Sequence, residues 1–422
     1  MTWTLVALPA ALFLAGLPIY IVLLAGATAT LLLFMTVPPL ALHQVMFGGV
    51  DNYALLAVPF FIFAGDLMAR SGIAGLLVRW VLALVGHIRG SLGVATIGTA
   101  TLLGAVSGSS PATVAALGQT LYPDLKRAGY GERFSLGLIT SSGSIAIIVP
   151  PSIAMILYGA TAEQSIPRLF LAGILPGLLL ALLVAAYILV WAQRRELRTD
   201  QRQAGQVAAA TRDALAALFM PLLVLGGIYL GLFSPTEAGG FACLYAILVA
   251  RFLFRSLTWD AILESAVQSA YLTAQVLVIV ASASVFSWVL SVLGVPQAIL
   301  GWIAGLDLSA LGFLLAINLL LLMLGCFLDP TSAILVLTPM LMPIIQHLGI
   351  DPIHFGIIMT VNLSIGMFTP PFGLNIFVSQ SVLSARLADI YRGLLPFFCV
   401  QLVALAAITF VPQLSLLLAE AL

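Results

Sequence analysis

The chain alternates long runs of apolar residues with short polar breaks, and the length of these runs is the first guide to its architecture. A helix needs about 20 apolar residues to cross the hydrocarbon core of a membrane. The runs that approach this length are Leu17–Phe34, Leu55–Met68, Phe134–Tyr158, Leu169–Trp191, Leu215–Phe233, Phe241–Leu253, Ala270–Leu293, Phe355–Val378 and Leu394–Val411. A shorter run, Leu5–Leu14, is a candidate for one more crossing. The pattern predicts an all-α polytopic membrane protein.

Two segments, residues 90–128 and 308–346, do not fit a simple crossing. Each has two apolar arms separated by a polar centre, Ser107–Pro111 in the first segment and Asp329–Ser332 in the second. The second arm of each segment is too short to span the membrane comfortably. We therefore expect two re-entrant helical hairpins whose tips lie within the membrane.

The two halves of the sequence also match one another. Shifting the window from Thr140 to Pro176 by 220 residues recovers Thr360, Ser364, Ile365, Pro370, Pro371, Ile376, Gly393, Leu395 and Pro396. The hairpin tips Ser110-Pro111 and Asp329-Pro330 match at a shift of 219. Each pair offers a capping side chain followed by a proline suited to the first turn of a helix. The sequence therefore contains an internal repeat.

This repeat divides the chain into a first unit at 1–192, a linker at 193–214 and a second unit at 215–422. Each unit holds one hairpin and one broken helix. The hairpins are expected at about 90–128 and 308–346, and the broken helices at about 134–158 and 355–378.

Charge sets the expected orientation of the two units. The linker holds five arginines, Arg194, Arg195, Arg198, Arg202 and Arg212, so the positive-inside rule places it in the cytoplasm. The base of the first hairpin is basic too, with Arg89, Lys126, Arg127 and Arg133. The base of the second offers Asp307, His347 and Asp351 and no basic residue. We therefore expect inverted repeats, an arrangement typical of secondary transporters.

Composition narrows the class of protein further. Hydrophobic residues make up 62% of the 422 residues and charged residues only 8%, with a net charge of zero. A soluble domain carries about 25% charged residues, so lipid must solvate much of this surface. The neutral charge, without a basic patch, argues against a nucleic-acid partner. The sequence has no GxGxxG, no GxxxxGK[ST] and no HExxH motif, which argues against an enzyme and against a cofactor.

Four segments are expected to be unwound inside the membrane, where only protein or a watery cavity can satisfy the freed backbone groups. Two lie at the hairpin tips, and two lie at Thr140–Ser144 and Asn362–Ser364, each running to a double proline. Hydroxyl, amide and carbonyl oxygens suit a hard cation such as Na⁺. The candidate sodium- and substrate-binding residues are Ser109, Ser110, Thr113, Thr140, Ser141, Ser142, Gly143, Ser144, Pro150, Asp329, Thr331, Ser332, Asn362, Ser364, Gly366, Thr369 and Pro370.

Simpler structural interpretations of these residues stay open. Asp329 can serve only as a helix cap, although a charge at membrane depth is a functional candidate by default. The small residues of Ser107–Ser110 can serve only to let helices pack closely. No Lys or Arg falls inside an expected crossing, so an anionic substrate would rest on helix N-termini and hydroxyls. Glu237 suits a helix start better than a binding site.

Several stretches resemble the large membrane (M) subunit of TRAP transporters, the tripartite ATP-independent periplasmic transporters of the DctM-like family. The resemblance runs nearly end to end. It rests on Pro59–Gly65, Ser107–Gly118, Ile148–Ile153, Arg168–Gly173, Phe233–Ala238, Leu328–Pro330 and Asn362–Pro371. One departure is Pro111, where the family more often has a small residue, which bears on the geometry of the tip and not on the fold.

The resemblance implies sodium-coupled uptake of an organic acid across the bacterial inner membrane. The implied partners are a periplasmic substrate-binding protein and a small four-helix membrane subunit. It also implies an elevator, in which a transport domain built around the hairpins moves against a scaffold. Ser109, Ser110, the 140–144 segment, Asp329, Thr331 and the 362–369 segment match the family's cation sites. The substrate itself stays unspecified.

Two other functions are compatible with part of this pattern. A stand-alone divalent-anion:sodium symporter of related architecture would share the inverted repeats. A passive membrane scaffold would have no use for two costly polar hairpin tips. Neither accounts for motifs that run along the whole chain.

Overall fold

The computed structural model describes residues 3–35, 37–38, 40–197, 206–305 and 309–420, and the described part is helical without a strand. Arg198, Arg202 and Asp307, which carried part of the charge argument, lie outside these residues. The α-helices are α1 (Leu8–Leu14), α2 (Ile19–Phe34), α3 (Leu40–Val50), α4 (Ala57–Arg70), α5 (Ile73–Val85), α6 (Ser91–Ser107), α7 (Ser110–Arg127), α8 (Glu132–Ile148), α9 (Ile153–Ala162), α10 (Ile166–Arg194), α11 (Gln206–Tyr229), α12 (Pro235–Leu248), α13 (Trp259–Val292), α14 (Val295–Gly305), α15 (Ala310–Gly325), α16 (Pro330–His347), α17 (Pro352–Gly366), α18 (Leu374–Leu383), α19 (Leu387–Phe410) and α20 (Gln413–Ala419). Short turns of other helix types occur at Trp3–Ala7, Tyr53–Leu56 and Val249–Leu253.

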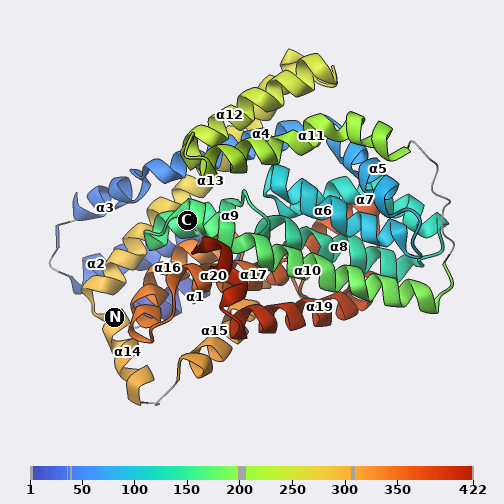
Figure 1. Cartoon of the computed structure of the whole chain (residues 1–422). Coiled ribbons are helices and arrows are strands. Elements are labelled where there is room, and N and C mark those ends of the chain that lie inside the picture. Colours follow the sequence, from blue (N-terminus) through green and yellow to red (C-terminus); the bar gives the residue numbers. More distant parts are fainter. Residues whose placement is uncertain (1–2, 36, 39, 198–205, 306–308, 421–422) are drawn as a thin grey trace.

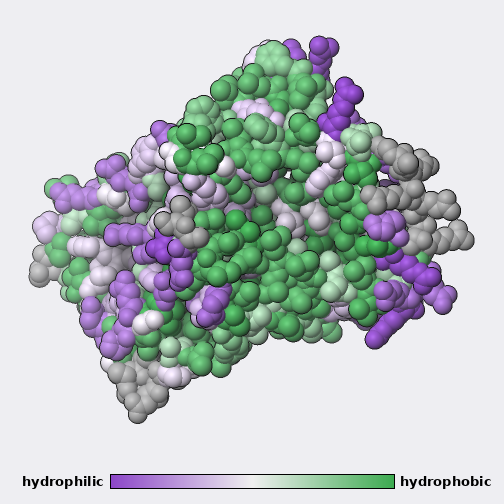
Figure 2. Space-filling view, viewed as in Figure 1, coloured by the Kyte–Doolittle hydropathy of each residue, from purple (hydrophilic) through white to green (hydrophobic). Residues whose placement is uncertain are grey.

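The helices are long and apolar enough for a multi-pass membrane protein. Within the described residues, six of them could cross a membrane, or seven if the bent pair α8 and α9 counts as one span. Figure 2 shows a broad apolar band across the middle of the molecule, with polar residues gathered at its two ends. The expectation of an all-α polytopic membrane protein is therefore confirmed.

The helices around the two expected hairpins occupy opposite ends of the molecule. The helices α6 and α7 lie toward the end where α10 stops and α11 begins, whereas α14, α15 and α16 lie toward the other end (Figure 1). At the outer edge, α11, α12 and α4 form one side, and α10 and α19 form the other (Figure 1). The opposite orientation of the two repeats in a membrane stays a prediction.

Packing between the two halves is crosswise. The helix after each helix break packs on the hairpin of the other half: α18 lies on α7, and α9 lies on α16. The closest crossing joins α8 with α19, where a methyl group on Gly137 would overlap the carbonyl of Gly393. Small residues let membrane helices approach this closely. The two halves thus share one core instead of forming separate domains.

Four helices were not expected from the apolar pattern: α3, α5, α14 and α20. The helix α5 is amphipathic, with Leu77 and Val81 buried and Arg79 at the surface of the bundle. Its apolar face packs on α6 and α11. Because it is 13 residues long and carries a charge, a search for runs of about 20 apolar residues passes over it.

Candidate functional site

The first hairpin turns at Gly108 and Ser109, between α6 and α7. Gly108 has a φ of 57°, which glycine adopts without strain. A side chain there would lie 2.9 Å from the carbonyl oxygen of Pro151, in the break between α8 and α9. The hairpin tip therefore sits directly on the interruption of the broken helix in its own half.

The expected cap at this tip is wrong. The capping position is Ser109, whose side chain makes no capping hydrogen bond, and Ser110 is the first helical residue. The Ser109 carbonyl instead accepts the hydroxyl proton of Thr113 at 2.9 Å. Ser110 is thereby released from capping and turns its hydroxyl into the core.

Ser110 makes the central polar contact of the first hairpin. Its side chain is fully buried and forms hydrogen bonds with the amide of Asn375, at 3.0 Å to Oδ1 and 2.7 Å to Nδ2. Asn375 also donates to the main-chain carbonyl of Thr140 at 3.3 Å. One amide from α18 thus links the start of α7 to the middle of α8.

The same network extends along α8 toward α19. The hydroxyl of Thr140 donates to Ser379 at 2.7 Å. The Ser144 hydroxyl donates to Oε1 of Gln401 at 2.8 Å, and Gln401 returns a bond to the carbonyl of Ser141 at 3.3 Å. All of these side chains are fully buried. Buried polar groups need such partners because an unpaired one is costly.

Three members of this network, Asn375, Ser379 and Gln401, are not among the residues that the sequence motifs single out. Each is a lone polar residue in an apolar helix, and polar residues within membrane segments are functional candidates by default. Applying that rule to amides and hydroxyls as well as charges would have found them.

The segment Thr140–Ser144 is helical, so the expectation that it unwinds is wrong. It lies inside α8, and the break comes later, at Val149–Ser152. The hydroxyls of Ser141 and Ser142 bond to carbonyls three residues earlier, and the Ser144 hydroxyl shares its proton between the Ser141 carbonyl and Gln401. Hydroxyls satisfied in this way can sit in a buried helix without unwinding it. Gly143 allows α7 to approach, since a side chain there would lie 2.6 Å from the Ser110 hydroxyl.

The second hairpin has the expected cap at Asp329. Its carboxylate accepts the main-chain N–H of Ser332 at 3.1 Å and the Ser332 hydroxyl as well. Unlike Ser110, Asp329 is exposed, whereas Ser332 is buried and Thr331 half-buried. The charge of Asp329 at the start of α16 is favourable to the helix dipole.

The exposed Asp329 faces an open groove of about 660 Å³. The groove is lined mainly by apolar side chains of α1 and of the second half, namely Phe13, Leu14, Phe327, Leu328, Phe372, Leu374 and Phe377. Pro370, also exposed, belongs to the adjoining break between α17 and α18. At this tip, α15 and α17 cross at Gly325 and Gly366, where a side chain on Gly366 would lie 2.5 Å from the Gly325 backbone.

The second broken helix departs from the expectation in the same way as the first, because the segment expected to unwind is helical. Asn362 and Ser364 lie inside α17, and the break begins only after Gly366. Ser364 and Thr369 bond to the carbonyls of Val361 and Ile365, both at 2.7 Å. Asn362 donates to the buried amide of Asn318, which in turn donates to Thr409 at 3.1 Å. The Asn362 Oδ1 atom is buried and has no hydrogen-bond partner among the described residues.

The candidate residues at the two hairpin tips therefore form two groups. The first joins Ser110, Thr140, Ser141 and Ser144, with Gly143 packed beside them. The second joins Asp329 with Ser332 at the tip and places Gly366 beneath it. Among the described residues, no hydrogen bond connects one group to the other. Each group combines oxygen ligands with a helix N-terminus. The oxygen ligands can hold a small cation. The helix N-terminus can hold an anion.

Comparison with known proteins gives the family context. A family described as "Tripartite ATP-independent periplasmic transporter, DctM component" matches residues 6–414. The chain is 41% identical to the C4-dicarboxylate TRAP transporter large permease protein DctM of Pseudomonas aeruginosa, over 94% of this chain and 92% of that protein. It is also 41% identical to the ectoine/5-hydroxyectoine TRAP transporter large permease protein UehC of Ruegeria pomeroyi, over 97% and 96%.

A solved structure shares the fold at much lower identity. The YdaH transporter of Alcanivorax borkumensis superposes with a TM-score of 0.62 at 17% identity, covering 98% of each chain. Its description reports an unusual topology. At this identity the likeness concerns the arrangement of helices alone.

Proposed function

Because this chain belongs to the DctM family of large permease subunits of tripartite ATP-independent periplasmic transporters, we propose that it forms the translocation pathway for sodium-coupled import of a small organic acid. The observation that carries this proposal is the pair of hairpin tips, each packed on or beside the interruption of a broken helix. Broken helices that meet within a membrane are the usual ion and substrate sites of secondary transporters.

The relatives support a carboxylate as the substrate class. One is named for C4-dicarboxylates and another for ectoine, and both substrates carry a carboxylate. Equal identity to the two does not favour either substrate. In this chain, the N-termini of α7 and α16 would supply backbone N–H groups and positive dipole ends to such an anion.

Oxygen atoms of the candidate residues support sodium as the coupling ion. In the first half these are the hydroxyls and carbonyls of Ser109, Ser110 and the Thr140–Ser144 turn. In the second half they are the Asp329 carboxylate, the Thr331 hydroxyl and the unpartnered Oδ1 atom of Asn362. Buried oxygen atoms without a donor are costly, and a bound cation would offset that cost.

The family name supports partners outside this chain. We propose a periplasmic binding protein that delivers the substrate and a small four-helix membrane subunit that braces the permease in the bacterial inner membrane. The helix α11 is suited to pack against a membrane partner. It is long and apolar enough to cross a membrane, but only 22% of its 18-residue apolar segment is buried within this chain. A helix face as apolar as this one must contact either lipid or another membrane helix.

An elevator movement fits the packing of the helices. The helices α6–α9 and α15–α18 hold both candidate groups and interlock crosswise. The helices α4, α11 and α12 lie together along one edge of the molecule (Figure 1), and α13 joins this second set by packing on α4, while it also contacts α16. We propose that the first set moves as one body against the second set. The stand-alone symporter is less favoured, since the relatives are named as permease subunits of TRAP transporters.

Asp329→Asn tests the sodium site. Asparagine caps a helix about as well as aspartate, so folding and assembly should stay near normal. If the charge helps to hold Na⁺, half-maximal uptake should require roughly tenfold more Na⁺, as expected for about 1.4 kcal/mol of lost binding. Uptake would be measured in proteoliposomes against external Na⁺, with the binding protein loaded and saturating.

Controls separate this result from general damage. Thr331→Ala and Ser364→Ala each remove one neutral oxygen and should weaken the Na⁺ response less. An unchanged Na⁺ dependence in Asp329→Asn would leave Asp329 as a cap only. Strong uptake of free substrate by the purified chain alone would instead favour the stand-alone symporter.

A further inference from the structure

A polar cavity lies away from both hairpin tips, at the arginine-rich end of the molecule. It has a volume of about 540 Å³ and lies between the start of α8, the end of α10 and the start of α19. Its lining includes four arginines, Arg133, Arg195, Arg386 and Arg392, and two carboxylates, Glu132 and Asp389. None of these residues takes part in the proposed transport site.

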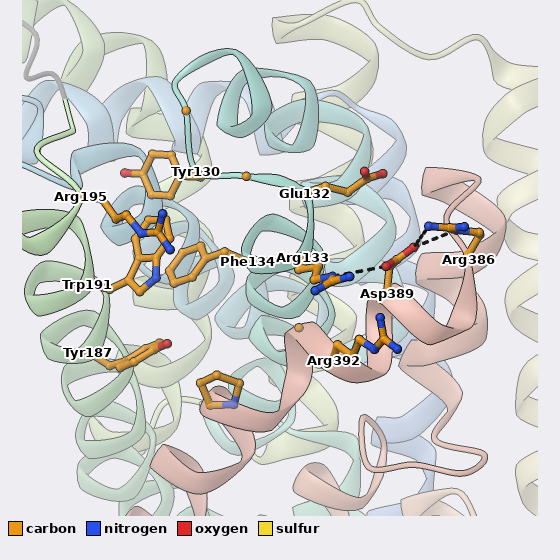
Figure 3. Close-up of a pocket in the computed structure, with 14 residues that line it drawn as sticks. Tyr130, Glu132, Arg133, Phe134, Tyr187, Trp191, Arg195, Arg386, Asp389 and Arg392 are labelled. Carbon is orange, nitrogen blue, oxygen red and sulfur yellow. Dashed lines mark hydrogen bonds and ion pairs between the residues drawn. The ribbon is translucent and has the colours of Figure 1, made fainter.

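Both carboxylates already form ion pairs with basic side chains of this chain. Asp389 pairs with Arg386 at 2.7 Å and with Arg133 at 3.4 Å. Glu132 pairs with Lys126 at 3.8 Å, outside the cavity lining. Figure 3 shows Arg133, Asp389 and Arg386 joined in a row, with Glu132 pointing away from them.

Arg195 and Arg392 therefore remain available to an anion. Neither forms an ion pair with a described carboxylate, and they stand on opposite sides of the cavity (Figure 3). The guanidinium of Arg195 lies over the ring of Trp191, 5.8 Å from its centre. Arginine guanidinium groups match the oxygens of a phosphate with two parallel hydrogen bonds.

Stacked aromatic rings form the wall on the α10 side. The ring centres of Phe134 and Trp191 are 3.7 Å apart, and Tyr130 stacks on Trp191 at 5.7 Å. Burial raises the pKa of the Tyr130 hydroxyl, which is neutral at neutral pH in any case. Tryptophan and tyrosine gather at the boundary between lipid and water, where their rings meet headgroups.

An apolar stripe leads from this cavity along α19. Leu395, Cys399 and Val403 are four residues apart and exposed, and the stripe begins beside Arg392 and Pro396 of the lining. Residues at this spacing share one helix face. The helices α10 and α19 form the edge of the molecule opposite α11 and α12 (Figure 1). A headgroup in the cavity would thus have a place for its acyl chain.

We propose that this cavity binds the phosphate headgroup of an anionic phospholipid from the expected cytoplasmic leaflet. Basic pockets between membrane helices at that face are typical sites for such headgroups. The phosphate lies against the guanidinium of Arg392, next to the start of the stripe, and Arg195 adds positive charge from the opposite wall. The acyl chain follows the exposed stripe of α19. A soluble phosphate would have no use for that stripe.

Lipid binding to the full chain in detergent, followed by native mass spectrometry, tests this site. The probes are dioleoyl phosphatidylglycerol, which is anionic, and dioleoyl phosphatidylcholine, which has no net charge. The wild-type chain should bind phosphatidylglycerol at least about tenfold more tightly than phosphatidylcholine. The double variant Arg195→Gln/Arg392→Gln should lose most of this preference, with phosphatidylcholine binding unchanged.

The matched control is Arg194→Gln, which removes an exposed arginine one position outside the cavity lining and should keep the preference. Arg392→Lys keeps the charge and should retain most of it. An unchanged preference in the double variant would overturn the proposal. Displacement of phosphatidylglycerol by equimolar inorganic phosphate would also overturn it, because the cavity would then be a site for free anions.

Discussion

The two hairpin tips have matching positions in the repeat but opposite surroundings. At the first, Ser110 is fully buried and bonded to Asn375 of the other half. At the second, Asp329 is exposed, bonds among the described residues only within its own first turn, and faces an open groove. The first tip is therefore held by the core, and the second is held mainly by its own helix and the Gly325–Gly366 crossing.

This difference shows how matching positions of a repeat can serve two roles. A tip bonded across the repeat boundary has to break several buried hydrogen bonds to move. A tip capped only by itself can tilt without leaving a polar group unpaired. We therefore expect the second hairpin to move more readily within the transport domain than the first.

The largest expected effect concerns the orientation of the two hairpins in the membrane, because each labelled position is accessible from one side or from the other. Single cysteines at Arg127 and at His347, both exposed at the bases of the two hairpins, should react with an impermeant maleimide from opposite sides of the membrane. The basic first base and the non-basic second base motivate this outcome. The background would lack the native Cys243, Cys326 and Cys399. Labelling of both positions from one side would remove the inverted repeat.

The next effect concerns packing at the second tip. Gly366→Val places branched carbons against the Gly325 backbone, and we expect a loss of about 3 kcal/mol of stability. The matched control is Gly75→Val in α5, where a side chain at the glycine meets nothing within 4 Å. Thermal unfolding in detergent would compare the two variants. Equal melting temperatures would mean that α15 and α17 can separate at little cost.

The smallest effect compares the polar contacts of the tips directly. Asn375→Leu leaves the buried Ser110 hydroxyl and the Thr140 carbonyl without this amide, so it should cost about 2 kcal/mol. Asp329→Ala removes an exposed cap and should cost about 1 kcal/mol. Adding Ser110→Ala to Asn375→Leu should cost less than the sum of the two changes. A larger loss for Asp329→Ala would reverse the comparison.

Much of the fold follows from one-dimensional patterns. Apolar runs located α10 and α13, and the double prolines located both helix breaks, because proline cannot continue the hydrogen-bond ladder. Asp329 was placed as a cap from its type and the proline that follows it. These features depend on neighbouring residues, so the sequence alone contains the needed information.

The rest depends on contacts between distant segments. The hydroxyl-rich stretch of α8 was expected to unwind, because polar residues in lipid suggested a break. In the folded chain, Gln401 from α19 and Ser379 from α18 satisfy it instead. No local pattern pairs residues more than 230 positions apart, so neither the helical state of this stretch nor the partner of Ser110 could be predicted.

The crossing of α8 and α19 limits how this protein can have evolved from a shorter ancestor. Gly137 and Gly393 belong to different repeats, and neither position tolerates a side chain while the two backbones touch. A gene that encoded one half alone would produce a chain whose central helix lacks its closest neighbour. Such a product would need a second copy of itself, so dimerisation is expected to have preceded gene fusion, and later divergence to have bound the two halves irreversibly together.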